Sequence, residues 1–188
     1  MSLTEPLSVR YRETYSEEYP ELSPAAVGIL ADMLALGRLH GPDLLLDAYR
    51  NRALTDGDLR VVLPDVWSMA EYPERALWPD LWVRLWRRAG FVSEAGAPAP
   101  TEPMVLHRGS TWGRRRGMAW TTDRTIAERF AYTLLGRLPG DVYTVTVEPD
   151  AVLAFIDAED GRKESEVIVD PAMLPPVRRP RRIEEEAK

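Results

Sequence analysis

The chain has 188 residues, 45% of them hydrophobic, and a formal net charge of −6, which is typical of one soluble globular domain or of a small domain with an extension. It has no cysteine and only two histidines, which excludes disulfides and thiolate metal sites and disfavours a zinc site, so we expect no bound metal. The acidic balance argues against nucleic-acid binding. No apolar run is long enough to span a membrane and no secretory signal is visible, so we expect a cytoplasmic protein.

The N-terminal half is predicted to be helical. Residues 1–22 are polar and read as a loose arm. A helical region over residues 23–92 follows, and its first helix begins at Ser23, a typical N-cap residue, with Pro24 at the first helical position. The further elements expected in this region are a helix over 42–54, a third element from 55 to 63, a short helix or turn over 64–73, and a helix from Trp78 to Gly90.

Three tryptophans recur every four residues in the last of these helices, at Trp78, Trp82 and Trp86. This spacing places all three on one helical face. We interpret that face as core packing, in preference to a docking surface for a partner.

The pattern changes after a proline-rich linker over residues 93–103. The core over residues 104–172 alternates between short apolar runs and turns, with one helix, and a charged tail over 173–188 follows. Its expected elements are strands over 104–110, 117–123, 141–149, 151–156 and 165–171, and a helix over 123–138. The sequence therefore predicts an α+β protein with a helical N-terminal region and a mostly β C-terminal half.

Polar residues at strand ends mark three stations in this half. Arg108 and Gly109 end the first strand, where a guanidinium fork can meet phosphate while the glycine lets the backbone come close. The alternative is an ion-paired arginine beside a turn glycine. In the second station, Trp120 offers a ring face for stacking, and Thr121 and Thr122 offer hydroxyls. The alternative there is a plain strand that leads into a helix cap.

The third station is the stretch ESEVIVDP, residues 164–171, in which Glu164 and Glu166 open a strand. Two carboxylates at positions i and i+2 of a strand point to the same face. In a cleft they would repel each other, and the pKa of one would rise. An ionised carboxylate could then stabilise an oxocarbenium ion, as in glycoside chemistry. The alternative is a charged strand edge that discourages sheet pairing.

The order of the three stations, from Arg-Gly through the hydroxyl strand and the helix IAERFA to Glu-x-Glu, resembles the arginine–serine–glutamate class of mono-ADP-ribosyltransferases over about residues 104–171. The resemblance implies a compact split β-sandwich that binds NAD as substrate. Arg108 would bind the NAD phosphates and Thr121 would position the catalytic Glu166. Glu164 would engage an arginine on an acceptor protein.

The resemblance also implies that Trp120 or Phe130 packs against nicotinamide and that the loop over residues 157–163 recognises the acceptor. The expected activity is therefore NAD-dependent mono-ADP-ribosylation of a protein arginine with release of nicotinamide, by a toxin-like effector, a phage-borne one or a housekeeping enzyme. An NAD glycohydrolase and an inactive transferase-fold binding module remain as alternatives. His107 is similar to the histidine on the first strand of the diphtheria-toxin-like branch, the less favoured assignment.

Overall fold

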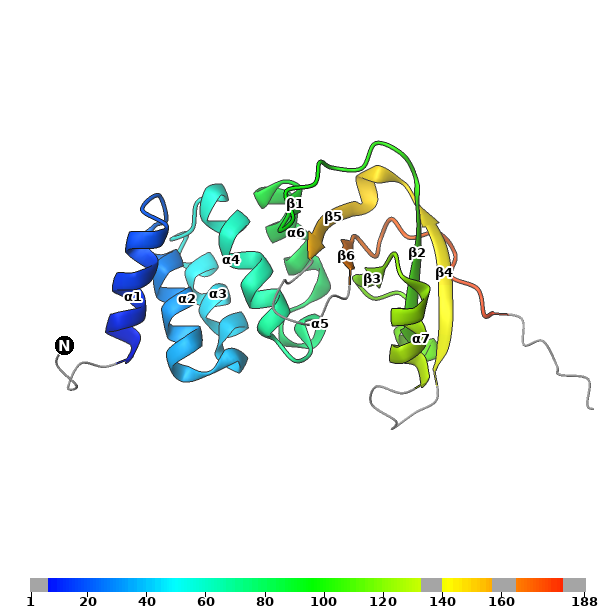
Figure 1. Ribbon diagram of the computed structural model, residues 1–188, viewed down its shortest axis with the longest axis horizontal. Helices are drawn as coiled ribbons and strands as arrows, with labels where there is room; N and C mark the ends of the chain where they lie inside the picture. Colours follow the sequence, from blue (N-terminus) through cyan, green and yellow to red (C-terminus); the bar gives the residue numbers. More distant parts are fainter. Residues whose placement is uncertain (1–6, 133–139, 157–164, 181–188) are drawn as a thin grey trace, which may run out of the picture. The chain divides into compact units, whose positions relative to one another are not determined.

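The computed structural model describes residues 7–132, 140–156 and 165–180. The chain divides into two compact units, Met1–Glu94 and Ala95–Lys188. The described part of the first unit is helical up to a two-residue strand at its end, and the described part of the second contains a sheet with one α-helix of nine residues (Figure 1). The protein is therefore α+β, as predicted, and the boundary between the units lies within the predicted linker.

The first unit is organised by hydrogen bonds at helix starts. Its helices are α1 (Leu7–Glu18), α2 (Pro24–Leu36), the 3-10 helix η1 (Arg38–His40), α3 (Gly41–Arg50), α4 (Asp56–Met69), α5 (Pro73–Ala76) and α6 (Pro79–Ala89), followed by strand β1 (Val92–Ser93). Ser23 caps α2 as predicted, because its side chain accepts from Ala26 N–H. Asp58 and Thr55 form a capping box at α4, and Asp58 also accepts from Ser23 N–H at 2.8 Å. One buried carboxylate thus joins the starts of two helices.

Two parts of this unit differ from the sequence-based expectation. Residues 7–18 of the predicted loose arm form helix α1, and Arg12 pairs with Asp32 of α2 at 2.7 Å. The two elements expected over residues 55–73 are largely one helix, α4, which runs through Pro64. A proline costs a helix one backbone hydrogen bond, but Pro64 lies in a run of buried residues, and burial of that run favours the continuous helix.

The tryptophans of the first unit separate into core and surface. Trp82 and Trp86 of α6 are fully buried and pack edge-on against Trp67 of α4, with ring centroids 5.1 and 6.4 Å apart. Trp78 is the N-cap residue of α6 and is 68% exposed. The predicted core face therefore holds for two of the three residues, because the helix begins only after Trp78.

The second unit is built on an antiparallel sheet. Its strands are β2 (Met104–Ser110), β3 (Ala119–Thr121), β4 (Asp141–Val147), β5 (Val152–Ile156) and β6 (Glu166–Val169), joined by η2 (Trp112–Arg114), α7 (Arg124–Tyr132) and η3 (Pro149–Ala151). The strands run in the order β5-β6-β3-β2-β4, and each neighbouring pair is antiparallel. Strand β3 therefore lies between β2, the first strand of the unit in sequence, and β6, the last.

Helix α7 packs on one face of this sheet, against β2 and β4 (Figure 1). The contact is close because Gly109 has no side chain: a Cβ built there would lie 1.9 Å from the carbonyl oxygen of Ala127 and 2.5 Å from the backbone nitrogen of Ala131. Ala127, Ala131 and Val142 form a small buried cluster at this contact. The close approach expected at Gly109 is therefore made by a helix backbone of the same unit.

The segment after β6 is fixed to the sheet up to at least Val177. Arg116 donates to the carbonyls of Pro171, Leu174 and Pro175 at 2.9–3.0 Å. Leu174 and Val177 are buried, so the first part of the predicted charged tail packs on the unit. Across the described ranges, no helix has the length and apolar character that crossing a membrane requires.

Candidate functional site

A row of four polar side chains crosses the sheet of the second unit. Thr144 of β4 pairs with His107 of β2, His107 with Thr121 of β3, and Thr121 with Glu166 of β6. Residues directly opposite each other in antiparallel strands project from the same face of the sheet. The register therefore places these four side chains side by side on one face, and we call them the polar row.

Thr121 and Glu166 are the pair that the sequence singled out, and the structure places them on adjacent strands. Thr121 is 5% exposed, and its hydroxyl accepts the N–H of Asp123 at 3.0 Å. Glu166 is the first residue of β6 and is half-buried. A hydroxyl held in place on the neighbouring strand is suited to orienting a carboxylate.

His107 lies in the middle of the polar row, and sequence reasoning gave it only a secondary place. Its Nδ1 is 2.9 Å from the hydroxyl oxygen of Thr144. Burial and the nearby positive charge of Arg124 lower the pKa of His107, while Asp123 and Glu128 act in the opposite direction. The imidazole is therefore neutral near pH 7, with one ring nitrogen a donor and the other an acceptor.

Asp123 caps the helix that covers this face of the sheet. Its carboxylate accepts from both the N–H and the hydroxyl of Thr125 at 2.7 Å. These hydrogen bonds lower the pKa of Asp123, so it stays ionised well into the acid range. The threonine–aspartate sequence thus fixes the start of α7, as one of the alternatives at this station anticipated.

Arg108 lies on the opposite face from the polar row, because it follows His107 in the same strand and pairs with buried Tyr143. Its guanidinium donates to the carbonyl of Arg114 at 3.1 Å and to the carbonyl of Ala119. Arg108 therefore ties the loop between β2 and β3 to the sheet. In this structure it is a positioning residue for β3, and it does not share a face with Thr121 and Glu166.

Of the two aromatic residues predicted to stack on a ring, Trp120 projects from the opposite face of the sheet to the polar row. Trp120 is 2% exposed, alternates with Thr121 along β3, and donates from its indole N–H to the carbonyl of Gly117 at 2.8 Å. Phe130 is 40% exposed on α7. Thr122 lies just beyond the end of β3. Of the predicted binding residues, Thr121 is the one that pairs directly with Glu166 across neighbouring strands.

Glu164 and the predicted acceptor loop over residues 157–163 lie outside the described residues. The expectation that Glu164 and Glu166 face the same way assumes that both lie in one extended strand. Ser165 has a φ of 43°, in the left-handed region, and β6 begins only at Glu166. The role predicted for Glu164 therefore stays a prediction.

The polar row has a carboxyl group, a neutral imidazole and two hydroxyls, and this set is better suited to binding a polar organic molecule than a metal ion. No group of three or more histidine, aspartate or glutamate side chains in the described ranges is arranged to hold a metal ion. The sequence draws attention to His107 through its place beside Arg108, but it does not determine which face of the strand His107 occupies, because Val105 and Leu106 are both apolar. The structure determines it, since Leu106 is fully buried whereas Val105 is 55% exposed.

Comparison of the chain with models of protein families, with curated proteins and with solved structures finds no match.

Proposed function

We propose that the second unit is an NAD-dependent mono-ADP-ribosyltransferase in which Glu166 is the catalytic carboxylate and Thr121 positions it. The observation that carries the proposal is the register of β3 against β6, which sets Thr121 directly beside Glu166. The two residues are 45 positions apart in the chain, and the motif order that indicates them contains no information on strand pairing. The strand order β6-β3-β2 also places the three stations on three neighbouring strands.

The chemistry that this pair supports is cleavage of a glycosidic bond. The bond between ribose C1′ and the nicotinamide nitrogen breaks, and its electron pair leaves with nicotinamide. Positive charge grows on the ribose, and an ionised Glu166 at that position would stabilise it. A guanidinium nitrogen of the acceptor then forms a bond to C1′ and releases its proton to solvent. The split β-sandwich of such transferases remains our prediction for the whole unit.

The phosphates of NAD need a different account from the one that the motif implied. Arg108 donates to two backbone carbonyls on the far side of the sheet from Glu166. We therefore assign Arg108 to holding β3 in register, which supports Thr121 indirectly. On the face of the polar row, Arg124 is close enough to His107 to lower its pKa, and it pairs with Glu128 at 2.9 Å. We propose that Arg124 exchanges this exposed partner for an NAD phosphate.

The test is nicotinamide release from NAD by the wild type and by Glu166→Gln. We expect release to fall by about 100-fold or more, because the amide cannot supply the stabilising charge. The matched control is Glu148→Gln, which changes an exposed glutamate that follows β4 in the same unit. Equal release by the Glu166 variant and the wild type would contradict the assignment.

The same preparations separate transfer from hydrolysis. With labelled NAD and agmatine, a small guanidino compound, a transferase yields labelled agmatine, whereas a glycohydrolase yields only free ADP-ribose. If neither nicotinamide release nor NAD binding is detected for the wild type, the unit is not an NAD enzyme and the proposal is wrong.

A further inference from the structure

The first unit contains a basic pocket that the proposed function does not use. It is lined by Tyr49, Arg50, Arg52, Leu54 and Arg88 and has a volume of about 460 Å³. That volume lies within the range of small-molecule binding sites, roughly 300–1,000 Å³. Three of the five lining residues carry guanidinium groups, so the pocket concentrates positive charge in a chain whose formal net charge is −6.

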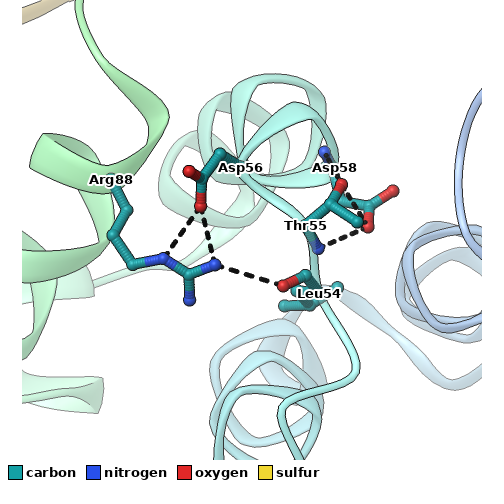
Figure 2. Close-up of polar contacts among 5 residues, drawn as sticks. All are labelled: Leu54, Thr55, Asp56, Asp58 and Arg88. Atoms are coloured by element: carbon teal, nitrogen blue, oxygen red, sulfur yellow. Dashed lines mark hydrogen bonds and ion pairs between the residues drawn. The ribbon is translucent and has the colours of Figure 1, made fainter.

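Arg88 is held in a fixed orientation at the wall of this pocket (Figure 2). Its Nε and one terminal nitrogen donate to the same carboxylate oxygen of Asp56 at 2.9 and 2.7 Å, and that terminal nitrogen also donates to the carbonyl of Leu54 at 3.2 Å. Asp56 offsets the charge of Arg88. Among the described residues, no ion pair involves Arg50 or Arg52, so the pocket keeps two uncompensated positive charges.

Two backbone carbonyls of the lining residues already accept hydrogen bonds within the unit. The carbonyl of Leu54 accepts from Arg88, and the carbonyl of Tyr49 accepts the N–H of Arg52 at 3.0 Å. The phenol of Tyr49 adds an O–H donor to the lining. The side chains of the lining residues therefore include three guanidinium groups and one phenol that can donate hydrogen bonds to an anionic ligand.

Arg52 occupies a conformation that arginine does not favour. Its φ is 53°, in the left-handed region that glycine and asparagine adopt at low cost. Asn51 is the immediate neighbour, yet the left-handed residue is an arginine that lines the pocket. The left-handed conformation belongs to the C-terminus of α3, because Arg52 N–H donates to the Tyr49 carbonyl and Ala53 N–H donates to the Ala48 carbonyl, both at 3.0 Å, which is the Schellman pattern. This hydrogen-bonded turn fixes the backbone of Arg52 beside the pocket that it lines.

We propose that this pocket binds the phosphoryl group of a small phosphorylated molecule. A phosphate monoester carries about −1.5 to −2 charges near neutral pH, which matches the two uncompensated arginines. The planar fork of arginine fits phosphate oxygens in a bidentate manner. The organic part of the ligand contacts the ring of Tyr49 and the side chain of Leu54. The inference goes beyond the proposed function, since all five lining residues belong to the first unit.

The experiment is a titration of the full chain with inorganic phosphate and with phenyl phosphate at constant ionic strength, followed by the amide NMR signals of residues 49–54. We expect saturable shifts with both probes, with at least threefold tighter binding of phenyl phosphate, and no saturable shift with chloride. Absence of saturable phosphate binding overturns the proposal. Equal affinity for the two probes overturns the assignment of Tyr49 and Leu54 to the organic part.

The decisive variant is Arg52→Gly, because it removes the charge and relieves the left-handed strain at once. Its thermal midpoint should equal or exceed that of the wild type, so weaker binding cannot reflect unfolding. We expect phosphate affinity to fall by about tenfold or more, as for loss of one charged hydrogen bond. The control is Arg84→Gln, on the same helix as Arg88. The side chain of Arg84 is exposed and donates to the Asp80 carbonyl. Wild-type affinity in Arg52→Gly, or an equal loss in Arg84→Gln, overturns the proposal.

Discussion

The contact between Gly109 and α7 makes a quantitative prediction for Gly109→Ala. The added Cβ would lie 1.9 Å from the carbonyl oxygen of Ala127, whereas ordinary contact begins at 3.4 Å. The helix backbone would therefore have to retreat by about 1.5 Å, and unlike a side chain it cannot rotate away. Overpacking of a core costs about 1–3 kcal/mol. We expect the upper end of that range or more, about 3 kcal/mol of unfolding free energy, measured by urea denaturation.

Gly113→Ala is the matched control for this prediction. It makes the same substitution four residues later, where the new Cβ meets no atom within 4 Å. Its stability should be unchanged or up to about 1 kcal/mol higher, since alanine loses less backbone entropy on folding than glycine. The packing argument is wrong if the unfolding free energy of Gly109→Ala lies within about 1 kcal/mol of the wild-type value and only NAD turnover falls. Gly109 would then be needed to let the ligand come close to the backbone.

Three further predictions concern single side chains. Thr121→Ser should keep nicotinamide release within about tenfold of the wild type while Thr121→Val loses far more, because only serine retains the hydroxyl beside Glu166. Arg108→Gln should lower the thermal midpoint, since it removes the bond to the Ala119 carbonyl; a raised KM for NAD at unchanged stability would instead indicate a phosphate ligand. For Asp58, burial alone would raise the pKa, but hydrogen bonds from Ser23 and Thr55 outweigh it and lower the pKa. Its stabilising effect is therefore present above about pH 4 and is lost as the pH falls below that value. Asp58→Ala should cost about 3 kcal/mol at pH 7 by urea denaturation and should flatten the acid dependence of stability; an unchanged acid dependence would exclude Asp58 as its source.

The elements that could be predicted from the sequence are those with local signals. Ser23 before Pro24 identified the start of α2, and the alternation of residues 141–147 identified β4. Helix α1 has no comparable apolar stripe, and Arg12 pairs with Asp32, which lies 20 positions further on. The run through Pro64 likewise depends on burial in the folded unit. These features are determined by long-range contacts, which a local pattern does not contain.

The candidate site could be predicted only in part, for the same reason. Motif order identified Thr121 and Glu166, and strand pairing does bring them together. The same motif order selected Arg108 and Trp120, but their directions follow from strand alternation and place them away from the polar row. Leu106, two positions before Arg108, is buried, so the two side chains share the face opposite the polar row. The sequence alone does not reveal this, because the neighbouring Val105 is apolar as well.

Arg108 and Gly109 of β2 have structural roles in place of the ligand-binding roles that the sequence predicted. Arg108 and Gly109 both make contacts within the unit, one to the Ala119 carbonyl and one to the backbone of α7. These contacts hold β3 and α7, the two elements on either side of Asp123, at fixed distances from β2. The hydroxyl of Thr121 bonds to Asp123 N–H within that same turn. The Arg-Gly dipeptide therefore acts on the proposed chemistry through the position of Thr121. It follows that losses at Arg108 or Gly109 should be accompanied by losses in stability, whereas a loss at Glu166 should not.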